Sequence, residues 1–152
     1  MDEISMNTNI ISEVSESWSW VGIQPVEIVG ENDFGNLVIR DTEGRYWRLC
    51  PEEVSCEVIA QNRDELDLLT RDQTFLTDWY MLSLKDQAEE AYGPLQQGHK
   101  FHLVLPGVLG GKYDMENVRM ITQVEQIRFS GSIGRQIQNV PDGQKVIVKI
   151  GD

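Results

Sequence analysis

Short apolar runs separated by turn residues dominate the first 60 residues of the chain. There are four of them: VEIVG after Pro25, NLVIR, RYWRL and SCEVIA. The second and third are joined by DTEG, and a four-residue link that ends in glycine is typical of a β-hairpin. The pattern therefore predicts four strands connected by turns, which favours an antiparallel sheet.

Helical spacing of apolar residues appears on both sides of these strands. Residues 4–18 place apolar side chains at near-helical intervals, which predicts an N-terminal helical segment within residues 1–20. After the strands, Asn62 and Glu65 have the spacing of a capping box. We therefore expect a short helix over residues 64–69.

A longer helix is predicted from Thr74 to Tyr92, where Gly93-Pro94 ends it. Its apolar residues form two sets that lie on different sides of the helix. The first set is Met81, Leu84, Ala88, Ala91 and Leu95, and the second is Phe75, Trp79 and Leu82. A helix that is apolar over so broad an arc is expected to pack deeply on the sheet.

The last third of the chain predicts two more strands, a helix and a closing strand. FHLVL and NVRMI are strand-like and flank a glycine-rich loop, and Thr122 begins a helix that runs to about Asn139. Gly131 and Gly134 leave two alternatives, because the helix either breaks there or approaches a neighbour closely. After a turn at 141–143, KVIVKI predicts the final strand.

These elements together predict one α+β domain over residues 1–152, mostly an antiparallel sheet with helices packed on one face. A chain of this length buries about 68–70% of its unfolded surface, which suffices for a core without disulfides. Trp47 and Trp79 are expected in that core. Trp18 and Trp20 either cap the core or lie in an interface, and the core is favoured.

Charge is the most informative feature of the composition. The formal net charge is −12, and residues 1–93 carry 20 acids against 6 bases, whereas residues 94–152 carry 5 acids against 7 bases. Such a protein is repelled by nucleic acid and by anionic membranes, and it attracts basic partners. The alternative is that the acidity serves solubility alone.

Other features of the sequence favour the cytoplasm. The N-terminal residues MDEISMNTNI have neither the basic region nor the apolar core of a secretory signal. No apolar run approaches the ~18–20 residues that cross a bilayer. Cys50 and Cys56 are expected to be buried thiols, as in a reducing compartment.

The stretch LPGVLGGKY, residues 105–113, resembles a phosphate-binding loop, but its spacing excludes that role. Gly107 and Gly111 are separated by three residues where the motif needs four, and Tyr113 stands where Mg²⁺ needs a small hydroxyl. A tight turn built on glycines is favoured instead. The two histidines, His99 and His102, point to opposite faces of a strand and cannot share a metal. We therefore predict no cofactor, no metal and no catalytic residue.

Eight carboxylates between residues 52 and 78 form the strongest candidate site, which we call the acidic belt. Its members are Glu52, Glu53, Glu57, Asp64, Glu65, Asp67, Asp72 and Asp78, opposed only by Arg63 and Arg71. Acids on loops beside a rigid sheet can present a negative surface to a basic partner. Partner binding and plain solubility remain equal alternatives on physical grounds.

Several segments together resemble a known family. They are residues 34–53, 75–80, 105–118 and 125–143, and the most specific part is Leu109 to Asn117. The chain resembles, from about residue 18 to residue 150, the C-terminal domain family of immunity proteins that protect bacteria from their own type VI secretion DNase toxins. Within the glycine-rich stretch the fold-specific turn residues are Gly107, Gly110, Gly111, Tyr113, Asp114 and Asn117.

The resemblance implies a non-enzymatic cytoplasmic inhibitor whose partner is a co-encoded toxin with a basic surface. It agrees with the charge, because a nuclease must offer phosphates a positive cleft that an acidic protein can occupy. Two alternatives stay open. One is a small hydrolase with an unrecognised site, and the other is a self-associating regulatory or scaffold module.

Overall fold

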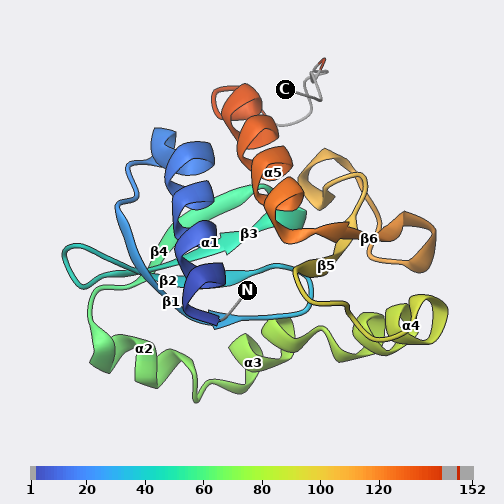
Figure 1. Cartoon of the computed structure of the whole chain (residues 1–152), viewed down its shortest axis with the longest axis horizontal. Coiled ribbons are helices and arrows are strands. Elements are labelled where there is room, and N and C mark those ends of the chain that lie inside the picture. The colour runs from blue at the N-terminus through green and yellow to red at the C-terminus, as the bar shows by residue number, and fades with distance from the viewer. Residues whose placement is uncertain (1–2, 142–146, 148–152) are drawn as a thin grey trace.

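The structure is a computed structural model that describes residues 3–141 and 147, with side chains from residue 9 onward. Its elements form a single α+β domain, as the sequence predicts (Figure 1). The predicted turn at 141–143 and the closing strand at 145–150 lie largely outside the described residues.

The four predicted strands form one antiparallel sheet in the order β1-β2-β3-β4. They span Pro25–Glu31, Leu37–Asp41, Tyr46–Cys50 and Ser55–Ala60. The β2–β3 hairpin is held by Asp41, whose Oδ1 accepts from the backbone N–H groups of Glu43 and Arg45, while its Oδ2 accepts from Trp47 Nε1. Burial alone would raise the pKa of Asp41, but these hydrogen bonds outweigh it and hold the pKa below its ordinary value.

Two helices from opposite ends of the chain cover one face of this sheet (Figure 1). They are α1, Glu3–Trp18, and α5, Gln123–Ile137. Helix α5 is continuous through both glycines, so the alternative of close approach is correct. A Cβ on Gly131 would lie 2.4 Å from the backbone oxygen of Ser17, and one on Gly134 would lie 3.0 Å from the Trp20 ring. Both glycines therefore let α5 pack directly on the end of α1 and the turn that follows it.

Two further helices cover the opposite face of the sheet, which corrects the prediction that helices pack on one face only. They are α2, Arg63–Leu69, and α3, Gln73–Tyr80. Leu66 of α2 and Trp79 of α3 pack against Val38 and Tyr46 of the sheet. Alternation explains this second core, because Val38 points away from the face on which its neighbours Leu37 and Ile39 are buried.

The long helix predicted from Thr74 to Tyr92 is in fact two helices, and this is the main correction to the predicted elements. Helix α3 ends at Tyr80, Met81 takes a left-handed conformation with φ 46°, and α4 spans Leu82–Tyr92. The two predicted apolar sets belong to different cores as a result. Phe75 and Trp79 pack under the four-stranded sheet, whereas Leu84 and Ala88 pack against the second sheet.

The two strands predicted around the glycine-rich loop are β5, His99–Leu103, and β6, Val118–Thr122, and they pair with each other as a second antiparallel sheet. Three short 3-10 turns complete the site region described below, at Pro51–Glu53, Gly107–Leu109 and Met115–Asn117. Helix α5 links the two sheets, because Gln126 Nε2 donates to Phe34 O before β2 and to Phe101 O in β5, each at 3.1 Å. None of the helices in the described part of the chain combines the length and the apolar character needed to cross a membrane.

Candidate functional site

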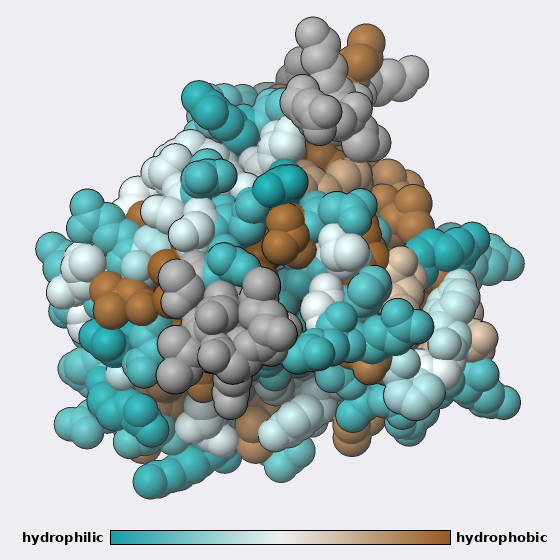
Figure 2. All heavy atoms as spheres, in the orientation of Figure 1, coloured by the Kyte–Doolittle hydropathy of each residue, from teal (hydrophilic) through white to brown (hydrophobic). Residues whose placement is uncertain are grey.

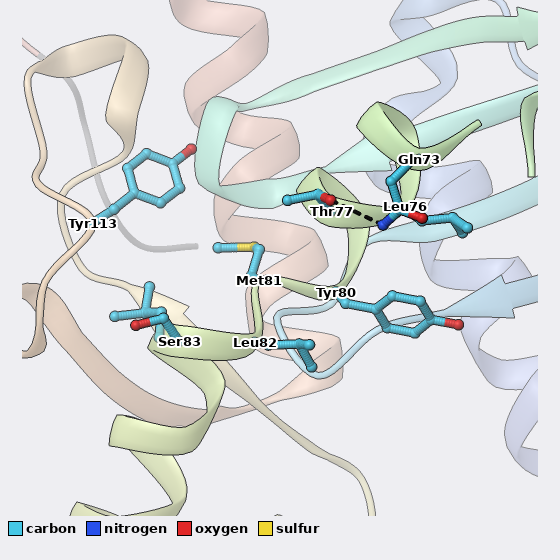
Figure 3. A pocket seen from close by; sticks show the side chains of 9 residues that line it. Gln73, Leu76, Thr77, Tyr80, Met81, Leu82, Ser83 and Tyr113 are labelled. Carbon is cyan, nitrogen blue, oxygen red and sulfur yellow. Dashed lines mark hydrogen bonds between the residues drawn. The ribbon is translucent and has the colours of Figure 1, made fainter.

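A groove of about 420 Å³ opens where α3 meets α4 and the loop between β5 and β6 comes close. Its walls are mostly apolar and include Leu76, Thr77, Tyr80, Met81, Leu82 and Tyr113. Met81 lies in the middle, between Tyr113 of the loop and Thr77 of α3 (Figure 3). Tyr80 and Leu82 are 52% and 59% exposed, so the groove has an apolar rim as well as apolar walls.

The bend between α3 and α4 that shapes this groove is fixed from the sheet side. Asn32 Nδ2 donates to the backbone oxygen of Trp79 at 2.8 Å, while Asn32 Oδ1 accepts from the N–H groups of Phe34 and Asn36. The Trp79 ring stacks on Phe75, with centroids 6.0 Å apart. A buried asparagine from the β1–β2 connection thus donates a hydrogen bond to a carbonyl at the end of α3, where the helix itself supplies no partner.

The opposite wall is the loop of residues 104–117, and Asn117 closes it. The Asn117 side chain accepts from Leu105 N at 2.9 Å and donates to Leu105 O and Lys112 O at 2.8 and 2.9 Å. Gly110 has φ 94°, and a Cβ on Gly111 would lie 1.7 Å from Leu105 O. Glycine is required at both positions, for backbone conformation at the first and for space at the second.

The loop rests on the acidic turn between β3 and β4. The Tyr113 hydroxyl donates to the Glu53 carboxylate, and a Cβ on Gly107 would lie 2.3 Å from that carboxylate. Burial, with the hydrogen bond to Glu53, raises the pKa of Tyr113 above its ordinary value, so the phenol stays protonated. Gly107 and Tyr113, predicted as turn residues, therefore join the loop to Glu53 of the acidic belt.

A smaller polar hollow of about 270 Å³ continues from the groove and shares Thr77, Met81 and Tyr113 with it. Beneath it Glu52 is only 5% exposed, and its oxygens accept from Asn36 Nδ2 at 2.7 and 2.9 Å and from Cys50 Sγ at 2.7 Å. Burial raises the pKa of Glu52, and burial together with the neighbouring carboxylate raises the pKa of Cys50. A thiol held protonated in this way is a hydrogen-bond donor and a poor nucleophile.

Arg48 connects this polar cluster to α3. Its Nε donates to Asn36 Oδ1 at 2.9 Å, and its Nη1 pairs with Asp78 Oδ2 at 2.8 Å. The guanidinium also lies over the Phe75 and Trp79 rings, 5.6 and 5.2 Å from their centroids. One side chain of β3 thereby fixes α3 by an ion pair and by cation–π contact.

The acidic belt is divided by the fold. Glu52 and Glu53 lie at the end of the β3–β4 hairpin where Cys50 pairs with Ser55, whereas α2 follows the end where Tyr46 pairs with Ala60. Four residues of strand separate these ends by about 13 Å. Glu52 is buried and presents no carboxylate to solvent, so the exposed belt is Glu53, Glu57, Asp64, Glu65, Asp67, Asp72 and Asp78, of which Glu53 and Asp67 are partly covered.

Most exposed acids of the belt also have local structural partners. Asp72 caps α3 by accepting from Phe75 N, and Asp67 pairs with Arg63 at 2.9 Å. Asn62 caps α2 as predicted, but the Glu65 carboxylate reaches Gln61 N, one residue before the cap. These carboxylates therefore stabilise helix ends while remaining accessible on the surface.

Of the two cysteines expected to be buried, Cys56 is buried and Cys50 is only partly covered. His102 is buried edge-on against Phe129, with ring centroids 5.1 Å apart, and burial lowers its pKa to about 4. Cys50 and Cys56 are free thiols. Among the described residues, no group of three or more His, Cys, Asp or Glu side chains could hold a metal ion.

Sequence reasoning missed Asn32, Asn36, Arg48 and Met81. The sequence carried a signal for Arg48, because it stands between the buried Trp47 and Leu49. Alternation along β3 therefore turns Arg48 to the opposite face, which α3 covers. A charged residue facing a covered side needs partners, and this requirement points to a polar cluster. Asn36 is completely buried but lies next to an ordinary strand, and its role depends on contacts that are distant in sequence.

Comparison with known proteins gives a family match, and it covers the residues that line this groove. No curated protein matches the chain. A family model does match, over a region that begins at the end of β4, includes α2, α3, α4, β5, the loop and β6, and ends within α5. Residues 60–134 match the family described as T6SS immunity protein Tdi1, C-terminal, so this half of the molecule is similar to type VI secretion immunity proteins.

Proposed function

We propose that the chain is an immunity protein that binds and neutralises a cognate toxin delivered by a type VI secretion system. The observation that carries this proposal is the family match, because residues 60–134 include both walls of the groove. Immunity by binding needs an accessible surface and no catalytic group. The protonated thiol and the engaged carboxylate beneath the groove agree with a binding role.

The proposed toxin is a nuclease with a basic surface, and the proposed attraction is electrostatic. A net charge of −12 opposes phosphate binding and favours association with the positive cleft of a nuclease. Exposed acids on and around α2, among them Asp64 and Glu65, are placed to steer such a partner. We propose the cytoplasm as the place of action, since a DNase would have to be met where DNA is.

Co-expression tests the proposal directly. Cells that express the toxin encoded beside this chain are expected to survive only when the chain is co-expressed, and the two proteins are expected to co-purify. A catalytically inactivated toxin serves as the viability control. Continued killing at full expression of the chain would overturn the proposal.

Charge reversal tests the acidic belt separately. Asp64→Lys, Glu65→Lys and Asp67→Lys together should slow association with the toxin at least tenfold at low salt, and the difference should shrink at high salt. Glu16→Lys, Glu89→Lys and Glu90→Lys together make the same change of net charge on α1 and α4. If both triple variants bind alike, only the overall charge matters and the belt assignment is wrong.

A further inference from the structure

The groove between α3, α4 and the β5–β6 loop combines three properties of a protein-binding site. It is concave, its rim exposes large apolar side chains, and its walls contain tyrosine and methionine, which are enriched in interfaces. The loop beside it exposes more large apolar side chains, at Val104, Leu105 and Val108. Figure 2 shows apolar residues gathered on the side of the molecule where Figure 1 places this loop.

The polar hollow gives the groove a charged end. Among the described residues that line it, the accessible carboxyl groups are those of Glu53 and Asp78 and the single base is Arg48, while Glu52 is buried. Arg48 is already engaged by Asp78 and Asn36, so a further cation would find excess negative charge there. Asp78 is 70% exposed and Glu53 is partly exposed, which leaves both within reach of a partner.

We propose that this groove receives a segment of the toxin that inserts one large apolar or aromatic side chain beside a lysine or arginine. The apolar side chain would lie against Met81, Tyr80 and Leu82, and the basic group would pair with Glu53 and Asp78. This inference rests on the proposed function and identifies the recognition chemistry at the groove, which is distinct from the exposed acids of α2.

Size and charge favour this occupant over others. A groove of about 420 Å³ lies within the range of about 300–1,000 Å³ that holds small ligands, and it suits one or two large side chains. A second copy of this chain would bring another 12 negative charges to a molecule that is already acidic and would be repelled. An apolar molecule without a cation would desolvate the carboxylates of Glu53 and Asp78 and add no charge to balance them beyond that of Arg48.

Both walls are fixed before any partner arrives. Asn32 holds the end of α3, and Asn117 closes the loop with three hydrogen bonds. A pre-organised pocket loses little conformational entropy on binding, so a few side chains can supply much of the affinity. Single substitutions in the groove should therefore have large effects on binding.

The apolar part of the proposal is tested with groove-filling and rim variants. The probe is the toxin encoded beside this chain, inactivated at its catalytic residue, and the measurement is the Kd by calorimetry. Thr77→Trp fills the groove and Leu82→Ala removes its rim, and each should raise the Kd at least tenfold. Gln87→Trp and Leu68→Ala make equivalent changes at exposed positions outside the groove and should stay within twofold of wild type.

The charged part is tested with isosteric neutral variants. Glu53→Gln with Asp78→Asn should raise the Kd and should flatten its dependence on salt. The double variant keeps an acceptor for Tyr113 and for Arg48, so both walls remain in place. Glu89→Gln with Glu90→Gln removes the same charge from α4 and should retain the wild-type salt dependence. Equal salt dependence in the two double variants would overturn the charged part.

The outcomes separate this inference from the proposed function. If the wild-type chain neither binds the toxin nor rescues cells, the proposed function fails. If it does both and the groove variants behave like wild type, only the groove assignment is overturned. Light scattering adds one more arm, because a wild-type dimer that Thr77→Trp converts to monomer would make the occupant a second copy and would also overturn it.

Discussion

The four-stranded sheet and the groove region differ in how they treat their large apolar side chains. Within the sheet and helices α1 and α5, the exposed ones among the described residues are Val26 and Val29, both on the edge strand β1. Between α3 and β6 the exposed ones are Tyr80, Leu82, Tyr92, Val104, Leu105, Val108 and Tyr113. Clustered apolar exposure is typical of an interaction surface, so we assign the proposed recognition to the second region and a supporting role to the first.

The two regions also differ in what holds them in place. The first is packed around Trp18, Leu37 and Ile39, which are all fully buried. The second packs on the first through apolar side chains such as Trp79 and is also tied to it by polar contacts from the β1–β2 connection. Asn32 bonds the end of α3, and Lys100 of β5 donates to Asn32 O at 2.9 Å and to Glu31 at 2.6 Å. Polar contacts set direction as well as distance, which suits a surface whose shape matters.

A large effect should come from Asn32→Ala, which breaks the polar connection between the regions. Two backbone N–H groups and the Trp79 carbonyl lose their partners, so the unfolding free energy should fall by about 3–4 kcal/mol. Urea unfolding measures the loss, and Asn139→Ala, at an exposed asparagine, is the control. A loss below about 1 kcal/mol would show that the connection does not depend on this side chain.

Acid should weaken the junction between β5 and α5 through His102. The pKa of this histidine is about 4 in the folded protein against an ordinary value of 6.5, so the unfolded chain binds the proton first as pH falls. The unfolding free energy therefore falls as pH drops from about 6.5 to 4. The loss that this histidine causes amounts to about 3 kcal/mol at pH 4.

His102→Gln isolates this contribution, because Glu52 acts in the opposite direction over part of the same range. The raised pKa of Glu52 favours the folded state at low pH, and that contribution is lost as pH rises. Unfolding curves at pH 7 and pH 4 should show a smaller loss for His102→Gln than for wild type. His99→Gln should behave like wild type, and identical losses in all three proteins would exclude the histidine as the cause.

Gly131→Ala should damage the supporting region alone. Its Cβ would lie 2.4 Å from Ser17 O, a backbone atom that cannot move without separating α5 from α1. Overpacking of this kind costs about 1–3 kcal/mol, whereas alanine in an unconstrained helix would stabilise by about 1 kcal/mol. The sign of the change in denaturant midpoint therefore decides whether the close approach exists. Ser132→Ala, the next residue of α5, should be nearly neutral.

The elements that the sequence predicted correctly carry their signals locally. The hairpin between β2 and β3 has its turn residues in place, and Asn62 and Thr122 cap α2 and α5 as their spacing predicts. The break at Met81 has no such signal, since neither glycine nor proline stands there. It depends on Asn32, which is 47 residues from Trp79 along the chain. Sequence periodicity cannot detect a helix end that a distant side chain imposes.

The candidate site was predicted in part for the same reason. Tyr113, Gly107 and Glu53 were each singled out, but their contact with one another follows from the packing of two turns that are distant in sequence. Glu52 looked like a surface acid because it stands beside Pro51 and Glu53. Only the fold shows that Asn36 and Cys50 cover it.

The smallest effect on stability is expected at the rim of the groove, and a pair of leucines on one helix makes the comparison sharpest. Leu82 is 59% exposed and Leu84 is 7% exposed, although both lie in the first turn of α4. Leu82→Ala should change the unfolding free energy by no more than about 0.5 kcal/mol, whereas Leu84→Ala should cost about 2–5 kcal/mol. If urea unfolding found equal losses, Leu82 would belong to the core, and the division between supporting and recognising regions would not hold within α4.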